Sequence, residues 1–444
     1  MREIIATSIV ILLVLVLVGC EKPELAIDVV KKEELSKQKE DGFVVVGYGW
    51  STKDDSKEAV REVLLSVKKG LGEKTPDYAV LFSTAGYDLD VVLKEIRTLL
   101  PTTQVYGGTS LLGVLSRDGY HIGKTGSLSL LAVSSEKIKF GVGGANLDNF
   151  ISSREAGKKA IREAIKNAGK MGELPKVVLI TAAPGKEEEI LLGIEDIIGK
   201  DIPIIGGSSG DDDITGEWKQ FANDRVYTNG VSLTAIFTEL KIGFAYEAGY
   251  FVTENSGIVT NATGRTIYEI ENRPAAEVYN EWTDGLISDK LRTGGTVLSE
   301  TTFYPLAKVL HDETGKIHYL SIHPLSVNLP EKSITVFANV KKGDELLLMH
   351  GNWELLLNRV QRTTRHALES KSISRGKGYF GIYTFCAGTL LAIPEEERAK
   401  IPLLINNELG DIPFIGTFTF GEQGFIQKVG NRHGNLANSM IVFG

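Results

Sequence analysis

The stretch PIIGGSSGDDD, residues 203–213, is a short apolar strand that ends in paired glycines and serines. Its Gly206–Gly210 segment fits G-x-S-x-G, the elbow that presents a nucleophilic serine. Such an elbow needs a strand before the serine and a helix directly after it. The β-branched residues before Gly206 predict the strand, but residues 211–216 are acidic, lack a helical apolar stripe and predict a loop. The context therefore argues against a hydrolase elbow.

The same pattern occurs twice more in the chain. VYGGTS (105–110) and IPFIGTFT (412–419) are also apolar strands that end in glycine and small hydroxyl residues. Each is preceded by another apolar strand with a glycine end, namely YAVLFSTAG to Gly86, VVLITAAPG to Gly185 and FGIYTFCAG to Gly388. The spacing between the two glycines is 21, 21 and 28 residues. This regularity predicts internal repeats.

Helical periodicity lies between and before these strands. Apolar residues three and four apart predict a helix inside each strand pair, and further helices are expected over 54–71, 153–168 and 353–369. Closing strands are expected from residues 127, 231 and 439. We predict an α/β fold of repeated β-α-β-α-β-β units whose sheets are covered by helices. Two copies fill 43–250 and a third fills 333–444, while 250–330 links the halves or caps a cleft.

The composition limits the classes of function. A chain of 444 residues is too long for one ordinary core, and its 42% hydrophobic and 24% charged residues are typical of a folded soluble protein. The net charge of −8 and the lack of a basic run argue against a nucleic-acid partner. The 7 histidines show no metal-binding spacing, and the acidic run 211–213 lacks the spaced ligands of a calcium loop. No metal or cofactor is therefore expected.

The first 42 residues have a different character. Residues 4–19 are nearly all apolar, but this run is shorter than the roughly 20 residues of a spanning helix and has the length of a signal peptide. Leu17-Val18-Gly19-Cys20 resembles a bacterial lipobox, which implies a lipid on Cys20 after cleavage of residues 1–20. Residues 21–42 are rich in Lys and Glu and predict a solvated tether. We expect an exported lipoprotein on the periplasmic or extracellular face of a membrane.

The glycine-ended strands suggest a binding site. Glycine lets a ligand approach the main chain closely, successive N–H groups form an anion-binding nest, and hydroxyls add donors and acceptors. If the copies surround a pseudo-symmetry axis, the three turns face one pocket. The alternative is that they are ordinary turns. The predicted ligand-binding residues are Gly107, Gly108, Thr109, Ser110, Gly206, Gly207, Ser208, Ser209, Asp211, Asp212, Cys386, Gly416, Thr417, Thr419 and Glu422.

The motifs together resemble the FIST family, named for F-box and intracellular signal transduction. The segments that carry the resemblance are IPIIGGSSGDDD, DRVYTNGVSLTAIF, VTNATGRTIYEIENRPAAEVYNEW, KKGDELLLMHGN, IYTFCAG and IPFIGTFTFGEQGFI, in family order. The resemblance covers about 43–444 and implies a FIST N-like domain over 43–250 and a FIST C-like domain over 251–444. It also implies sensory binding of small compounds such as amino acids. The family motifs fall on Gly206, Gly207, Asp211, Asp212, Cys386, Ala387, Gly388, Gly421 and Glu422.

One position departs from the family pattern. Related proteins often carry an arginine after Cys-Ala-Gly, where this chain has Thr389. We expect a membrane-anchored, non-catalytic protein that binds a small polar ligand, such as an amino acid, and serves a signalling partner. Asp211 or Asp212, or Glu422, would accept the ligand's ammonium group. Two alternatives stay open: a hydrolase or transferase with Ser208, Ser209 or Cys386 as nucleophile, and a structural cell-envelope protein.

Overall fold

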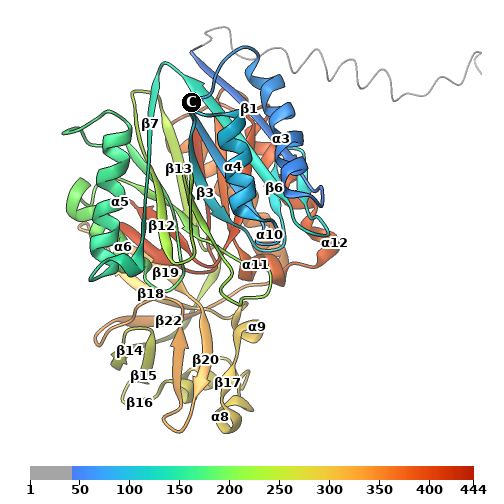
Figure 1. The fold of residues 1–444 in the computed structure, drawn as a ribbon. Coiled ribbons are helices and arrows are strands. Elements are labelled where there is room, and N and C mark those ends of the chain that lie inside the picture. Colours follow the sequence, from blue (N-terminus) through green and yellow to red (C-terminus); the bar gives the residue numbers. More distant parts are fainter. Residues whose placement is uncertain (1–42) are drawn as a thin grey trace, which may run out of the picture. The chain divides into compact units, whose positions relative to one another are not determined.

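Three units with the same strand order make up most of residues 43–444, which are the part of the chain that this computed structural model describes (Figure 1). The first unit contains β1 (Val44–Ser51), α3 (Ser56–Leu71), β2 (Tyr78–Ser83), α4 (Leu89–Leu99), β3 (Gln104–Thr109), β4 (Val114–Ser116), β5 (Gly119–His121) and β6 (Leu128–Ser135). The second contains β7 (Ile138–Asn146), η1 (Leu147–Asn149), α5 (Ser153–Asn167), β8 (Val177–Ala182), α6 (Glu187–Ile198), β9 (Ile204–Ser208), β10 (Gln220–Ala222), β11 (Arg225–Tyr227) and β12 (Gly230–Thr238). The predicted signal peptide, Cys20 and the tether lie outside the described residues.

The third unit is interrupted in sequence. It begins with β13 (Ile242–Glu247) and resumes with α10 (Trp353–Glu369), β23 (Phe380–Cys386), α11 (Ala387–Ala392), α12 (Glu395–Arg398), α13 (Lys400–Leu409), β24 (Phe414–Thr419), β25 (Glu422–Ile426), β26 (Gly430–Gly434) and β27 (Asn438–Phe443). The prediction that this unit occupies 333–444 is therefore wrong at its start. Its first strand lies about a hundred residues upstream of α10, where proximity in sequence gives no indication of it.

The interrupting segment, residues 251–350, forms a sheet of its own with a separate apolar core. We call it the insertion. It contains β14 (Phe251–Thr263), β15 (Thr266–Ile270), β16 (Arg273–Pro274), α7 (Ala275–Trp282), α8 (Lys290–Thr293), β17 (Gly295–Thr296), α9 (Leu298–Thr301), β18 (Leu306–His311), β19 (Ile317–Ile322), β20 (Pro324–Asn328), β21 (Ser333–Val336) and β22 (Glu345–His350). In Figure 1 it is the yellow and orange lobe below the three units.

Each unit builds one sheet in the same way. The strand orders are β1-β6-β2-β3, β7-β12-β8-β9 and β13-β27-β23-β24, with the last two strands of each parallel. A hairpin from another unit then extends each sheet: β10-β11 pairs with β3, β25-β26 with β9, and β4-β5 with β24. The exchange of hairpins is cyclic, so the three units close around a pseudo-threefold axis. The predicted repeated α/β fold is confirmed.

The cores follow from this arrangement. The inner faces of the three sheets form one apolar cluster that includes Phe82, Leu179 and Ile382, one from each unit. Helices cover the outer faces, and several begin at a side-chain cap such as Asp55 before α3 or Asn352 before α10. Among residues 43–444 no helix has the length and apolarity needed to cross a lipid bilayer.

Candidate functional site

The three glycine turns lie together at the carboxyl ends of their parallel strands. The N–H of Gly210 donates to the carbonyl of Thr109 (2.9 Å), that of Leu111 to Phe418 (3.1 Å) and that of Phe420 to Ser208 (2.9 Å). Each turn therefore bonds to both others. The cavity among the units, lined by Gly207, Thr384 and Thr417, has a volume of only about 10 Å³. This is room for about one water molecule.

Close packing accounts for the glycines in these turns. A Cβ atom on Gly108 would lie 2.5 Å from Ser209 Oγ and 2.9 Å from Thr181 Oγ1, and one on Gly207 would lie 2.6 Å from a Thr419 methyl carbon. The turn amides also have partners inside the protein, since Ser208 N donates to Gly421 and Ser209 N to Ala182. The ligand-binding role of these turns stays a prediction, and a ligand larger than water would require the turns to separate.

Gly108→Ala is expected to destabilise the protein by about 1–3 kcal/mol, because the new methyl group overlaps Ser209 Oγ and overpacking costs about that much. Adding Ser209→Ala removes the overlapping atom and should restore part of the loss. Gly388→Ala is the control, because its nearest contact is 3.1 Å from the end of the Leu436 side chain. Urea denaturation measures all four proteins. Equal midpoints for wild type and Gly108→Ala would contradict this packing.

The predicted acidic residues hold the loop after β9. Oδ2 of Asp211 accepts hydrogen bonds from the N–H groups of Thr215, Gly216 and Glu217 at 2.7–3.1 Å. Oδ1 of Asp212 accepts from the N–H of Leu112 at 2.5 Å, which ties this loop to the first unit. Residues 209–219 contain no helix, as expected from the sequence. Ser208 therefore does not occupy a nucleophile elbow.

A buried ionic network joins the second unit to the insertion. Glu187, the first residue of α6, has a side chain that is 1% exposed and accepts hydrogen bonds from Ser208 Oγ (2.8 Å) and the Arg265 guanidinium (2.6 Å). Arg265 also contacts Glu188 at 2.8 Å. Burial alone would raise the pKa of Glu187, but the nearby His433 and Arg265 outweigh it and hold the pKa below its ordinary value. The Glu187 side chain is therefore a buried carboxylate.

The third unit extends this network. Gln423 Nε2 donates to Ser208 Oγ (3.2 Å) and lies 3.0 Å from His433 Nδ1. His433 Nε2 lies 3.1 Å from the carbonyl of Phe337 in the insertion. Polar side chains from two units and the insertion thus meet beside Ser208. With its hydroxyl donated to a carboxylate and no exposed surface, Ser208 has the environment of a structural residue.

A second buried cluster surrounds Cys386 and Glu422. Glu422 accepts hydrogen bonds from Thr419 Oγ1 (2.8 Å) and the N–H of Ala437 (3.0 Å). Burial raises its pKa to about 8, and burial raises the pKa of the Cys386 thiol well above its ordinary value. A thiol that stays protonated is a poor nucleophile. The geometry therefore gives Cys386 the character of a buried core residue.

Arg359 of α10 reaches the same cluster and is fully buried. Its guanidinium donates to the carbonyls of Ala248 and Leu436, to Asn438 Oδ1 (2.9 Å) and to Thr389 Oγ1 (3.2 Å). The Arg359 guanidinium therefore lies beside Thr389 of α11, although it comes from a different helix.

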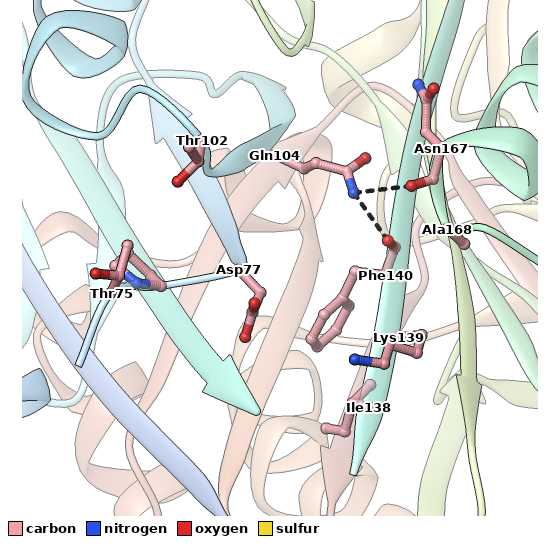
Figure 2. Close-up of a pocket in the computed structure, with 10 residues that line it drawn as sticks. Thr75, Asp77, Thr102, Gln104, Ile138, Lys139, Phe140, Asn167 and Ala168 are labelled. Atoms are coloured by element: carbon pink, nitrogen blue, oxygen red, sulfur yellow. Dashed lines mark hydrogen bonds between the residues drawn. The ribbon is translucent and has the colours of Figure 1, made fainter. Parts of the chain in front are cut away.

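A larger pocket lies at the other ends of the strands. It has a volume of about 290 Å³ and is formed where the amino ends of β2 and β3 meet β7 and the end of α5. Figure 2 shows its polar side chains, which include Asp77, Gln104 and Lys139. None of the predicted site residues lines it. The pocket and the predicted turns are thus at opposite ends of the units.

Sequence reasoning missed Asp77, Gln104, Lys139, Glu187, Arg265 and Arg359. One signal was available. The three residues before β9 and before β24 both read Asp-Ile-Pro (201–203 and 411–413). The residues at the same distance before the strand-end glycine of the first unit read Thr-Thr-Gln (102–104). The first unit therefore departs from the sequence of the other two at residues that line the 290 Å³ pocket, Thr102 and Gln104.

Comparisons with known proteins identify the family but not a ligand. An uncharacterised protein of Methanocaldococcus jannaschii is 28% identical over 157 residues, which cover 34% of this chain and 27% of that protein, so the chain spans about a quarter of its relative's length. Cyanuric acid hydrolase from A. caulinodans aligns over 90% of this chain and 99% of its own at 7% identity and a TM-score of 0.37. PurLQS from Thermotoga maritima aligns over 91% and 73% at 11% identity and a TM-score of 0.21. At these identities and TM-scores the two structures carry no information about the function of this chain.

The family assignment rests on two domain matches. The FIST N domain matches residues 77–273 and the FIST C domain matches residues 275–425. They follow one another in the predicted order and together include most of the three units and the insertion. FIST domains are generally regarded as small-ligand sensory domains of signal transduction. This chain belongs to the FIST family.

Proposed function

We propose that this protein is a sensory protein that binds a small polar metabolite of the amino-acid class. The observation that carries the proposal is the polar pocket of about 290 Å³ in a chain of the FIST family. Pockets for drug-sized ligands measure about 300–1,000 Å³, so a pocket at the lower limit suits a metabolite. Its lining combines an acid, a base, hydroxyls and amides with apolar residues such as Phe140.

Calorimetric titration with each of the twenty standard L-amino acids tests this function. At least one is expected to bind, and at 100 times its Kd a ligand stabilises the folded state by about 2.7 kcal/mol and raises the Tm. Short organic acids and amines serve as comparisons. If no amino acid gives heat of binding or a shift in Tm, the proposed ligand class is wrong.

Covalent probes test the competing enzymatic function. A fluorophosphonate and iodoacetamide are expected to label the native protein slowly, because Ser208 and Ser209 are buried and the pKa of Cys386 is raised by burial. Denatured protein is the control for thiol labelling. Fast labelling of one residue in the native state would favour the nucleophilic enzyme instead.

We further propose that a lipid on Cys20 holds the protein at a membrane, where it serves a signalling partner. The lipobox-like sequence and the tether-like composition of 21–42 support this. Expressed in a bacterium, the wild-type chain should enter the membrane fraction and incorporate labelled palmitate, and Cys20→Ser should not. Unlabelled, soluble wild-type protein would overturn the anchor without affecting the ligand proposal.

A further inference from the structure

We propose that the 290 Å³ pocket between the first and second units, here called the corner pocket, is the ligand site and binds a zwitterion through Asp77 and Lys139. Asp77 would accept hydrogen bonds from the ligand's ammonium group, and Lys139 would donate to its carboxylate. The inference rests on the proposed function and adds to it the place and the charge requirement of recognition.

The two charged side chains are available for a ligand. Among residues 43–444 neither Asp77 nor Lys139 takes part in an ion pair, and both are exposed. Oδ2 of Asp77 accepts from the N–H of Ser135 at 2.8 Å, which fixes the carboxylate and leaves Oδ1 as an acceptor. Figure 2 shows both side chains on the lining of the same pocket, Asp77 before β2 and Lys139 on β7. The carboxylate of Asp77 from the first unit and the ammonium group of Lys139 from the second unit therefore line the same pocket.

One wall of the pocket is held by hydrogen bonds of Gln104. The Gln104 amide donates from Nε2 to the carbonyls of Phe140 (2.9 Å) and Asn167 (3.3 Å), and its Oε1 accepts from the N–H of Val142 (2.8 Å) (Figure 2). Through its bonds to Phe140 and Val142, the Gln104 side chain pairs with the main chain of β7 as the backbone of a neighbouring strand would. It fixes Phe140 and, through β7, the backbone of Lys139. A pre-organised wall reduces the entropy that is lost when a ligand binds.

Comparison among the units shows that Gln104 and Asp77 have no counterparts of the same kind in the other two units. Residues three before Gly107, Gly206 and Gly416 are Gln104, Pro203 and Pro413. Proline has no side-chain amide and cannot make the Gln104 contacts. The residues that precede the adjacent strands β2, β8 and β23 are Asp77, Lys176 and Tyr379, so the carboxylate also occurs only in the first unit. The other two units adopt the same strand order with other residues at these positions, so the repeated fold does not by itself require this carboxylate and this amide.

Both charges are needed for tight binding. A single ion pair that solvent can reach strengthens binding by only about fivefold or less. When one rigid ligand makes both ion pairs, its translational and rotational freedom is lost only once. The second ion pair therefore adds to the affinity without a second loss of this kind. An amino acid should therefore bind more tightly than the corresponding amine, which lacks the carboxylate, or carboxylic acid, which lacks the ammonium group.

Calorimetry with the twenty standard L-amino acids on the full chain tests the site, with Asp77→Asn and Lys139→Met as variants. The amide introduced by Asp77→Asn would retain an oxygen for the Ser135 N–H, so the fold should persist, and thermal melts check this. Each variant is expected to lower the affinity of the tightest-binding amino acid about three- to fivefold. Asp201→Asn and Lys200→Met are the matched controls, because both residues are exposed and lie between α6 and β9 of the second unit, outside the lining of the pocket. The controls should bind within twofold of wild type.

The outcomes separate the two proposals. Loss of binding in the pocket variants alone supports the corner pocket. Wild-type binding that neither pocket variant changes overturns the corner pocket and leaves the proposed function standing. A wild-type protein that binds none of the twenty amino acids overturns both. Equal affinity for an amino acid and its amine overturns the zwitterion requirement.

Discussion

Arg265→Met should destabilise the protein by about 3–5 kcal/mol, the usual cost of removing one partner of a buried ion pair. The variant leaves Glu187 with its carboxylate 1% exposed and without its guanidinium at 2.6 Å. Ser208 Oγ and the Gly185 N–H remain as donors without positive charge, and the His433 ring remains 3.8 Å from the carboxylate. The midpoint of urea denaturation, followed by circular dichroism, is the measurement.

Two further variants separate charge from packing. Arg273→Met removes an ion pair with Glu281 in which both side chains are at least half exposed, and it should cost at most about 1 kcal/mol. Adding Glu187→Gln to Arg265→Met removes the carboxylate that has lost its guanidinium partner, so the double variant should be more stable than Arg265→Met alone. If Arg265→Met lowers the free energy of unfolding by no more than Arg273→Met does, the surroundings of Glu187 do not have the low dielectric constant expected of a buried site.

The network also shows how the insertion is attached. Arg265 and Phe337 of the insertion contact Glu187 and His433 of the units through charged and polar groups. The N–H of Asn339 donates to Glu188 at 2.7 Å, and that of Asn435 donates to the carbonyl of Ser321 at 2.9 Å. These contacts form a polar interface, which couples the insertion to the buried cluster beside the turns by specific contacts.

Much of the fold could be predicted because its elements carry strong local signals. The helix expected over 353–369 matches α10 (Trp353–Glu369), and the one expected over 153–168 matches α5 (Ser153–Asn167) within a residue. Both have an apolar stripe and a capping residue, which identify a helix without tertiary information. The exchanged hairpins were missed because strands such as β4 (Val114–Ser116) and β10 (Gln220–Ala222) are too short for a periodic pattern. Their pairing with another unit is decided by packing alone.

The sites depended on contacts that sequence spacing does not report. Glu187 and Arg265 are 78 residues apart, and Gln104 meets Asn167 across 63 residues. The turns were recognised because glycine is distinctive, but their common cavity of about 10 Å³ depends on how closely Gly108 and Gly207 pack against hydroxyl side chains. A repeated motif predicts that copies meet. Whether they leave a space depends on atomic packing.

The second large effect is pH dependence from Glu422. Its pKa is about 8 in the folded protein and about 4.5 in an unfolded chain, because burial disfavours the carboxylate. Below pH 4.5 both states hold the proton, whereas between 4.5 and 8 only the folded state does, so the free energy of unfolding falls as pH rises through this window and levels off above 8. A shift of this size corresponds to a loss on the order of 5 kcal/mol. Thermal melts from pH 4.5 to 9 measure it.

Part of the window is free of opposing titrations. Burial lowers the pKa values of His121 and His323 to about 4, so these histidines add stability as pH rises to about 6.5 and oppose Glu422 there. Around Glu422, burial keeps Cys386 and Tyr246 protonated by raising their pKa values, and Arg359 is the neighbouring cation. The fall in Tm between pH 6.5 and 8 should therefore belong mainly to Glu422. Glu422→Gln should abolish it, and Glu254→Gln, at an exposed position, should not. A Glu422→Gln protein whose Tm falls as steeply as that of wild type would show that the buried carboxyl is already ionised at neutral pH.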